Sequence, residues 1–225
     1  MTRLIFITGT DTGIGKTFLT VLLTRYLRGQ NRNVAALKPF CSGGRDDAEA
    51  LHAALGGMLS LDEINPWHFR SPVAPLIAAR EEKRRIKLSE AVEHIRAIRK
   101  RFPMMLVEGA GGLLSPLGED FDSRDLIHAL RAIPIIVGSN RLGVINQIRL
   151  TLGALSKSSS AHAQIVLMSP RIPDSSNKTN VKLLGQFVEP RRIHQLPWME
   201  SKRQTTARAV HQSMERLLRN LSPLD

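Results

Sequence analysis

A glycine-rich segment near the N-terminus has the residue types of a phosphate-binding loop. Residues 9–17 read Gly-Thr-Asp-Thr-Gly-Ile-Gly-Lys-Thr, between a short apolar run and an amphipathic segment. Glycines let backbone N–H groups close around phosphate oxygens, and the start of a helix adds positive potential. We therefore expect Lys16 to reach the β- and γ-phosphates of a nucleotide and the Thr17 hydroxyl to ligate Mg²⁺. The first glycine stands one position earlier than the strict pattern requires, so the strand–loop–helix context carries this interpretation.

Carboxylates that suit a magnesium site occur further along the chain. Mg²⁺ bound to a nucleotide usually takes one or two protein carboxylates besides the loop hydroxyl. Glu108 follows an apolar run, and the glycines of residues 109–112 permit close approach of the backbone to a ligand. Asp46 and Asp47 open a predicted helix, and from position alone they are better explained as partners of the helix N-terminus.

A second lysine loop, residues 38–44, reads Lys-Pro-Phe-Cys-Ser-Gly-Gly and follows the second apolar run. It brings a cation and a hydroxyl to the same end of the sheet as the phosphate loop. A strand-end lysine whose stem packs on the surface while its ammonium reaches water explains Lys38 equally well. Cys41 has no neighbouring base, so we expect it to be an inert, apolar side chain.

Apolar runs and amphipathic segments alternate from one end of the chain to the other. Continuously apolar strands are typical of a parallel sheet that is covered on both faces. We expect one α/β domain over residues 1–225, a doubly wound, mostly parallel sheet with helices on both faces and ligands at the carboxyl ends of the strands. We predict strands at 4–8, 33–38, 104–107, 133–137 and 165–168, helices at 16–28, 46–55, 90–101, 125–131, 145–155 and 207–221, and polar loops at 156–160 and 171–179.

Composition and charge favour a protein that binds anions and argue against a disulfide-bonded or membrane-spanning protein. The chain has 225 residues, 42% of them hydrophobic, and a formal net charge of +12, which favours anionic partners without choosing among them. A single cysteine excludes an intrachain disulfide and favours a reducing compartment. Since no apolar run approaches the length of a membrane-spanning helix, we expect a cytoplasmic protein that does not act in the membrane.

Five motifs in order along the chain resemble those of the dethiobiotin synthetase family, ATP-dependent ligases of biotin biosynthesis with the P-loop fold. They are residues 9–17, Lys-Pro-x-x-Ser-Gly at 38–43, Val-Glu-Gly-Ala-Gly-Gly at 107–112, Leu-Gly-x-Ile-Asn at 142–146, and Pro-Trp at 197–198. The resemblance spans nearly the whole chain. It implies that CO₂ and 7,8-diaminononanoate form a carbamate, which ATP phosphorylates before the second amine closes the ureido ring.

The resemblance also assigns roles to residues of this sequence. It implies catalytic Lys38 and Lys16, with Thr12 and Ser42 contacting the substrate and carbamate. It implies that Mg²⁺ is held by Thr17, Asp47 and Glu108, with Asp47 rather than Asp46 because the family's acid precedes an alanine. The residues implied to bind the nucleotide are Gly13, Ile14, Gly15, Lys16, Thr17, Phe18, Asp47, Glu108, Gly109, Ala110, Gly111, Ser169, Pro197, Trp198 and Met199.

The fourth motif implies a homodimer. In the family, the helix that begins near Gly143, Val144 and Asn146 comes from the partner subunit and holds the substrate carboxylate, which suits the free N–H groups of a helix start. The chain departs from the family after the fifth strand, where Ser169 and Pro170 replace the asparagine that contacts adenine. We therefore expect weaker selection of the nucleotide base.

An alternative from another class is a partitioning-type regulatory ATPase that binds DNA non-specifically through the positive charge. Such proteins resemble this phosphate loop but carry a second lysine where Asp11 stands. The loop 38–43 also favours the ligase. Segment 80–101 is rich in Lys and Arg, yet aromatic residues make up only 4% of the chain, so platforms for stacking bases are scarce. We expect a solvated basic surface there, and no specific nucleic-acid partner.

Overall fold

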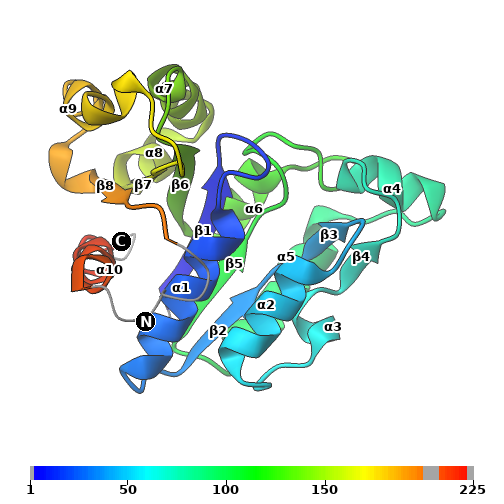
Figure 1. Ribbon diagram of the computed structural model, residues 1–225. Coiled ribbons are helices and arrows are strands. Elements are labelled where there is room, and N and C mark those ends of the chain that lie inside the picture. Colours follow the sequence, from blue (N-terminus) through cyan, green and yellow to red (C-terminus); the bar gives the residue numbers. More distant parts are fainter. Residues whose placement is uncertain (1–2, 200–207, 222–225) are drawn as a thin grey trace.

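The computed structural model describes residues 3–199 and 208–221 (Figure 1). The strands are β1 (Arg3–Gly9), β2 (Val34–Leu37), β3 (Phe40–Ser42), β4 (Trp67–Phe69), β5 (Met104–Glu108), β6 (Ile133–Ser139), β7 (Gln164–Met168) and β8 (Ile193–Leu196). The helices are α1 (Lys16–Gly29), α2 (Asp46–Leu55), α3 (Leu61–Ile64), α4 (Pro75–Glu81), α5 (Leu88–Arg99), α6 (Ser123–Leu130), α7 (Val144–Ala154), α8 (Lys157–His162), α9 (Asn180–Leu184) and α10 (Arg208–Arg219), with 3₁₀ turns at Ser175–Lys178 and Pro190–Arg192.

Within the described residues, six strands form one parallel sheet in the order β2-β5-β1-β6-β7-β8. Every residue of β1 from Leu4 to Gly9 is buried, and successive residues of a strand point to opposite faces. Both faces of the sheet are therefore covered: α1 packs against β1, β2 and β5, α6 packs against β1, and α7 and α8 pack against β6. This confirms the expected doubly wound α/β fold.

The sequence of crossovers decides where a ligand can bind. The chain passes from β1 outward to β2, returns to β5 between them, and then crosses β1 to reach β6 on its other side. The carboxyl ends of β1, β2 and β5 are therefore neighbours at the point where the strand order reverses. In parallel sheets of this kind, ligands bind in the crevice at that point.

A small two-stranded sheet stands beside the main one and was not predicted. β3 pairs in parallel with β4, and the rings of Phe40 and Trp67 stack with their centroids 4.9 Å apart. Strands of three residues are too short to show a clear alternation in sequence, which explains why the pattern missed them. β3 is part of the second lysine loop, residues 38–44, so the small sheet holds this loop beside the end of β2 (Figure 1).

One predicted loop is wrong. Segment 156–160 was expected to be a serine-rich loop, but helix α8 begins at Lys157. The Ser156 side chain caps this helix, because its Oγ accepts a hydrogen bond from the backbone N–H of Ser159 at 3.2 Å. The terminal helix predicted from residue 207 is observed over Arg208–Arg219, and residue 207 itself lies outside the described residues. In the part of the chain that the structure describes, no helix is long and apolar enough to cross a membrane.

Candidate active site at the strand ends

The phosphate loop connects β1 to α1, as the sequence predicts. Gly15 directly precedes the helix with φ +96°, a conformation that side chains other than glycine rarely adopt. A Cβ there would also lie 3.3 Å from the end of the Met168 side chain, a tight contact that a small shift of this flexible chain relieves, so the positive φ is what requires glycine. Because Lys16 is the first residue of α1, the unpaired N–H groups of the helix start face the loop.

Lys16 lies across the loop and is itself mostly buried. Its Nζ donates a hydrogen bond to the backbone carbonyl of Asp11 at 2.6 Å. Burial and the neighbouring positive charge of Lys38 lower the pKa of Lys16 to about 8. The ammonium is thus held at the centre of the loop, where phosphate oxygens approach in related loops.

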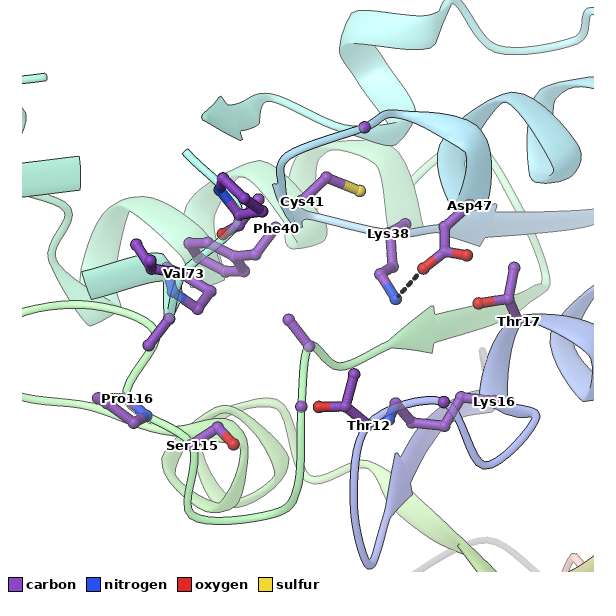
Figure 2. Close-up of a pocket in the computed structure, with 18 of the residues that line it drawn as sticks. Thr12, Lys16, Thr17, Lys38, Phe40, Cys41, Asp47, Val73, Ser115 and Pro116 are labelled. Atoms are coloured by element: carbon purple, nitrogen blue, oxygen red, sulfur yellow. Dashed lines mark ion pairs between the residues drawn. The ribbon is translucent and has the colours of Figure 1, made fainter. Parts of the chain in front are cut away.

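Four side chains, three from α1, α2 and β5 and one from the loop after β2, form a compact cluster beside the phosphate loop. The Lys38 Nζ lies 2.6 Å from Glu108 Oε1 and 2.8 Å from Asp47 Oδ2. The Thr17 hydroxyl donates to the same Glu108 oxygen at 2.7 Å. Figure 2 shows Lys38, Asp47 and Thr17 pointing toward one another at one side of a cavity. Asp46, the neighbouring carboxylate, makes no ion pair with Lys38 among the described contacts.

The charges of the cluster support one another electrostatically. Burial by itself lowers the pKa of Lys38, but the attraction of Glu108 and Asp47 outweighs it and raises the pKa above its ordinary value. For Asp47 the signs are reversed: burial raises its pKa, and the ion pair with Lys38 brings it below the ordinary value. Both groups are therefore charged at neutral pH.

The backbone around Lys38 is held by a helix turn that the sequence analysis missed. The Lys38 N–H donates to the carbonyl of Ile64 at 3.0 Å, and the buried Asn65 side chain donates to the carbonyls of Lys38 and Pro39. Asn65 follows α3, whose N-terminus is capped by Ser60 and Glu63. The Asn-Pro dipeptide at 65–66 is a turn signal in the sequence, but only the fold brings it to Lys38.

The donor set of this cluster suits a magnesium ion. Thr17, Asp47 and Glu108 present hard oxygen atoms, which Mg²⁺ prefers. Glu108 is fully buried, and its second oxygen, Oε2, finds no hydrogen-bond partner among the described residues. A buried carboxylate oxygen without a partner is costly in a protein interior, and a bound cation or its water would relieve that cost.

A cavity of about 680 Å³ opens beside the cluster. Its polar side includes Thr12, Lys16 and Lys38, and the buried hydroxyl of Ser42 lacks a partner in the described part of the chain. The opposite side is apolar and includes Phe40, Pro72, Val73, Pro75 and Pro116, residues that the sequence analysis did not select. Ala110 and Gly111 complete the lining, whereas Gly109 is packed against Phe6 and Ser123, where a Cβ would clash.

Cys41 also lines this cavity but does not have the environment of a nucleophile. Burial raises the pKa of its thiol to about 11, so the thiol is protonated at neutral pH. This agrees with the expectation of an inert side chain.

A second cavity, of about 660 Å³, lies on the other side of the phosphate loop and shares Gly13 and Gly15 with the first. It is largely apolar. Most of the predicted nucleotide-binding residues line one or both cavities, whereas Glu108 and Gly109 line neither. Those lining only the second are Ile14, Phe18, Ser169, Pro197, Trp198 and Met199. The Ser169 hydroxyl accepts a hydrogen bond from the side-chain amide of Gln195 at 3.1 Å, so one of its acceptor positions is occupied.

The predicted carboxylate site at the start of α7 lies outside both cavities of this chain. Gly143 is exposed with φ +93°, and Val144 is buried and donates its N–H to the carbonyl of Arg141. Asn146 is exposed. Beside them, Leu142 and Leu150 are 82% and 66% exposed. The single chain therefore does not bring these residues to the cluster.

Comparison with known proteins finds a matching family model and similar enzymes over most of the chain. Residues 3–206 match a family model described as an AAA domain. An ATP-dependent dethiobiotin synthetase of Anaeromyxobacter dehalogenans is 38% identical over 202 residues, which cover 87% of this chain and 90% of that enzyme. The one of Bacillus licheniformis is 43% identical over 151 residues, which cover 65% of this chain and just under two thirds, 64%, of the relative.

Among solved structures, pNOB8 ParA bound to nonspecific DNA is similar with a TM-score of 0.60 at 11% identity, covering 98% of this chain and 99% of that chain. At this identity the likeness shows the fold alone. It therefore does not extend DNA binding to this chain.

Proposed function

The chain belongs to the family of ATP-dependent dethiobiotin synthetases, and on that basis we propose how its residues carry out the reaction. The substrates are 7,8-diaminononanoate, CO₂ and ATP. One amine attacks CO₂ to give a carbamate, and a carbamate oxygen takes the γ-phosphoryl group of ATP, which releases ADP. The second amine then attacks the carbonyl carbon and displaces phosphate, which closes the ring of dethiobiotin.

The observation that carries this proposal is that Lys16, Lys38 and Asp47 line the first cavity, with Glu108 in contact with Lys38, beside the phosphate loop that both cavities share. The phosphates would lie on the loop that both cavities share, with the base in the largely apolar cavity beside Trp198. The diamine would occupy the other cavity. Its hydrocarbon chain suits the apolar side formed by Phe40 and Val73, and its amines suit the polar side.

The two lysines have separate roles in this arrangement. Lys16 contacts the β- and γ-phosphates from the start of α1, and Lys38 neutralises the carbamate and the phosphoryl oxygens that approach it from the first cavity. Thr12 and the unpartnered Ser42 hydroxyl orient the substrate. Charge that develops on oxygen is stabilised most where the donors are already in place and water is scarce. No side chain needs to form a covalent bond with the substrate.

A magnesium ion is part of the proposal. Thr17, Asp47 and Glu108 would hold it, as the unpartnered Glu108 oxygen supports. When bound, the ion would neutralise negative charge on the β- and γ-phosphates during transfer.

A homodimer would explain the position of α7. The exposed Leu142 precedes α7 and the exposed Leu150 lies further along it. Both suit a subunit interface, through which Gly143 and Asn146 of one chain would reach the substrate carboxylate in the other. Leu150→Glu would then give a monomer with a raised KM for the diamine and little change in nucleotide affinity. Light scattering and steady-state kinetics measure both, and a dimer that survives the substitution would exclude this surface.

The remaining parts of the proposal concern the chain as a whole. We take residues 1–225 to act as one P-loop domain. A cytoplasmic location is supported by the single cysteine and by the need for ATP.

The activity is tested with purified protein, Mg²⁺, ATP, the diamine and bicarbonate. Phosphate release should require both the diamine and bicarbonate, and mass spectrometry should detect dethiobiotin. ATP hydrolysis that DNA stimulates and the diamine does not would instead support the partitioning-type ATPase.

A further inference from the structure

Lys38 lies among the oxygen atoms that the proposed magnesium ion would need. Its ammonium contacts one oxygen of Glu108 and one of Asp47, and the Thr17 hydroxyl donates to the same Glu108 oxygen. The side chain of Lys38 is only 6% exposed and that of Glu108 is 0% exposed, so water screens their ion pair little, whereas the 46% exposed Asp47 is screened more. The dashed line in Figure 2 marks the bond between Lys38 and Asp47, beside the Thr17 hydroxyl.

The formal charges of the two buried lysines and of the two carboxylates that Lys38 contacts balance before any ligand arrives. Lys16 and Lys38 supply two positive charges, and Asp47 and Glu108 supply two negative charges. A divalent cation on its own would leave this buried region with excess positive charge, which a low-dielectric interior disfavours. A nucleoside triphosphate brings more negative charge than one such cation neutralises. The two ligands together are therefore acceptable where the cation alone is not.

We propose that Lys38 is an internal counter-ion that keeps a divalent cation away from Thr17, Asp47 and Glu108 until a nucleotide is bound. Once the nucleotide and cation are in place, the Lys38 ammonium leaves the carboxylates and turns into the first cavity, which its side chain already lines. Lys38 then meets the carbamate only when the phosphoryl donor is present. This inference rests on the proposed metal ligands, and it adds an order of events that those ligands alone do not imply.

The test measures binding of Mn²⁺, a paramagnetic probe for the magnesium site, by electron paramagnetic resonance of the free ion. Wild-type protein is titrated with and without a non-hydrolysable ATP analogue, and the variants Lys38→Met and Lys38→Arg are titrated without nucleotide. We expect Lys38→Met to bind Mn²⁺ alone at least about tenfold more tightly than wild type, about 1.4 kcal/mol. Lys38→Arg, which keeps the charge, should stay within about threefold of wild type.

Two further variants serve as a control for loss of charge and as a replacement if Lys38→Met does not fold. Lys16→Met removes the same charge from the same site, but Lys16 contacts the Asp11 carbonyl rather than a carboxylate, so its gain should be clearly smaller. If Lys38→Met does not fold, Lys38→Gln takes its place, since it loses the charge but keeps a hydrogen-bond donor for Glu108.

Three outcomes would overturn the inference: wild type that binds Mn²⁺ equally well with and without nucleotide, a neutral Lys38 variant that gains nothing, or an equal gain in Lys16→Met. Failure of the proposed metal site itself has a different signature. In that case Glu108→Gln would leave Mn²⁺ binding in the presence of the nucleotide analogue unchanged.

Discussion

Selection of the nucleotide base should be weak in this enzyme. Adenine differs from guanine at its edge by an amino group that donates a hydrogen bond where guanine has a carbonyl that accepts one. To recognise the adenine amino group, the protein needs a hydrogen-bond acceptor beside it. A side chain such as an asparagine amide offers both a donor and an acceptor, so it can make two hydrogen bonds to the adenine edge. Among the described residues lining the second cavity, Trp198 and Arg171 have side chains that only donate, and Ser139 and Ser169 offer one hydroxyl each.

The size of the effect follows from these contacts. A hydrogen bond between neutral groups contributes about 0.5–1.5 kcal/mol, and the Ser169 hydroxyl already accepts one from Gln195. A single hydroxyl at the base edge would distinguish the bases by one such bond, which corresponds to a selectivity of about tenfold or less. Apolar contact with Ile14, Phe18 and the 54% exposed Trp198 serves all bases alike.

The assay compares kcat/KM for ATP, GTP, CTP and UTP at saturating diamine and bicarbonate, with phosphate release as the readout. We expect GTP or CTP to be used within about tenfold of ATP. Ser169→Asn should raise the preference for ATP, because an asparagine side chain supplies both a donor and an acceptor. Ser169→Ala is the matched control and should change the ratio little. A wild-type preference for ATP above about a hundredfold would refute the reasoning and show that backbone groups, or the segment around Pro197 and Met199, read adenine.

The other predictions concern the two lysines and the stability of the fold. Lys38→Ala should lower turnover about 10²–10³-fold while weakening nucleotide binding less than Lys16→Ala does, as kinetics and equilibrium titration would show; near-normal turnover would remove Lys38 from the mechanism. Since burial lowers the pKa of Lys16 to about 8 and phosphates bind its charged form, nucleotide affinity should fall by up to about tenfold per pH unit above pH 8. Lys16→Arg stays charged and should abolish that dependence, so a pH profile shared by both proteins would exclude Lys16 as its source. Asp122 caps α6 by accepting hydrogen bonds from the N–H groups of Arg124 and Asp125, so Asp122→Ala should cost about 1 kcal/mol in urea unfolding; an unchanged midpoint would mean that the cap contributes nothing.

Local sequence patterns were sufficient to predict the phosphate loop and most of the sheet. Gly15, Lys16 and Thr17 are consecutive, and the loop's geometry depends on backbone conformations that glycine alone adopts readily. The buried strands read as apolar runs because both of their faces are covered. Such features depend on neighbours in the chain, which the sequence displays directly. The alternation that predicts a strand needs more than three residues, so β3 and β4 were missed, and the run of serines at 156–160 concealed a helix cap.

The site as a whole was decided by tertiary structure. Position in the sequence explained Lys38 equally well as a strand-end surface lysine and explained Asp47 as a partner of a helix N-terminus. Asp47 and Glu108 are 61 positions apart in the sequence. Only the crossover that returns β5 between β2 and β1 brings their carboxylates to one ammonium. The Asn65 side chain that holds the Lys38 backbone likewise comes from a turn that the sequence marks but does not place beside Lys38. From the sequence alone, we could identify the charged side chains and the strand ends that they follow. The ion pairs of Lys38 with Asp47 and Glu108 depend on contacts of 2.6–2.8 Å in the folded chain. Electrostatic and hydrogen-bond energies depend on separation in space and not on separation along the chain.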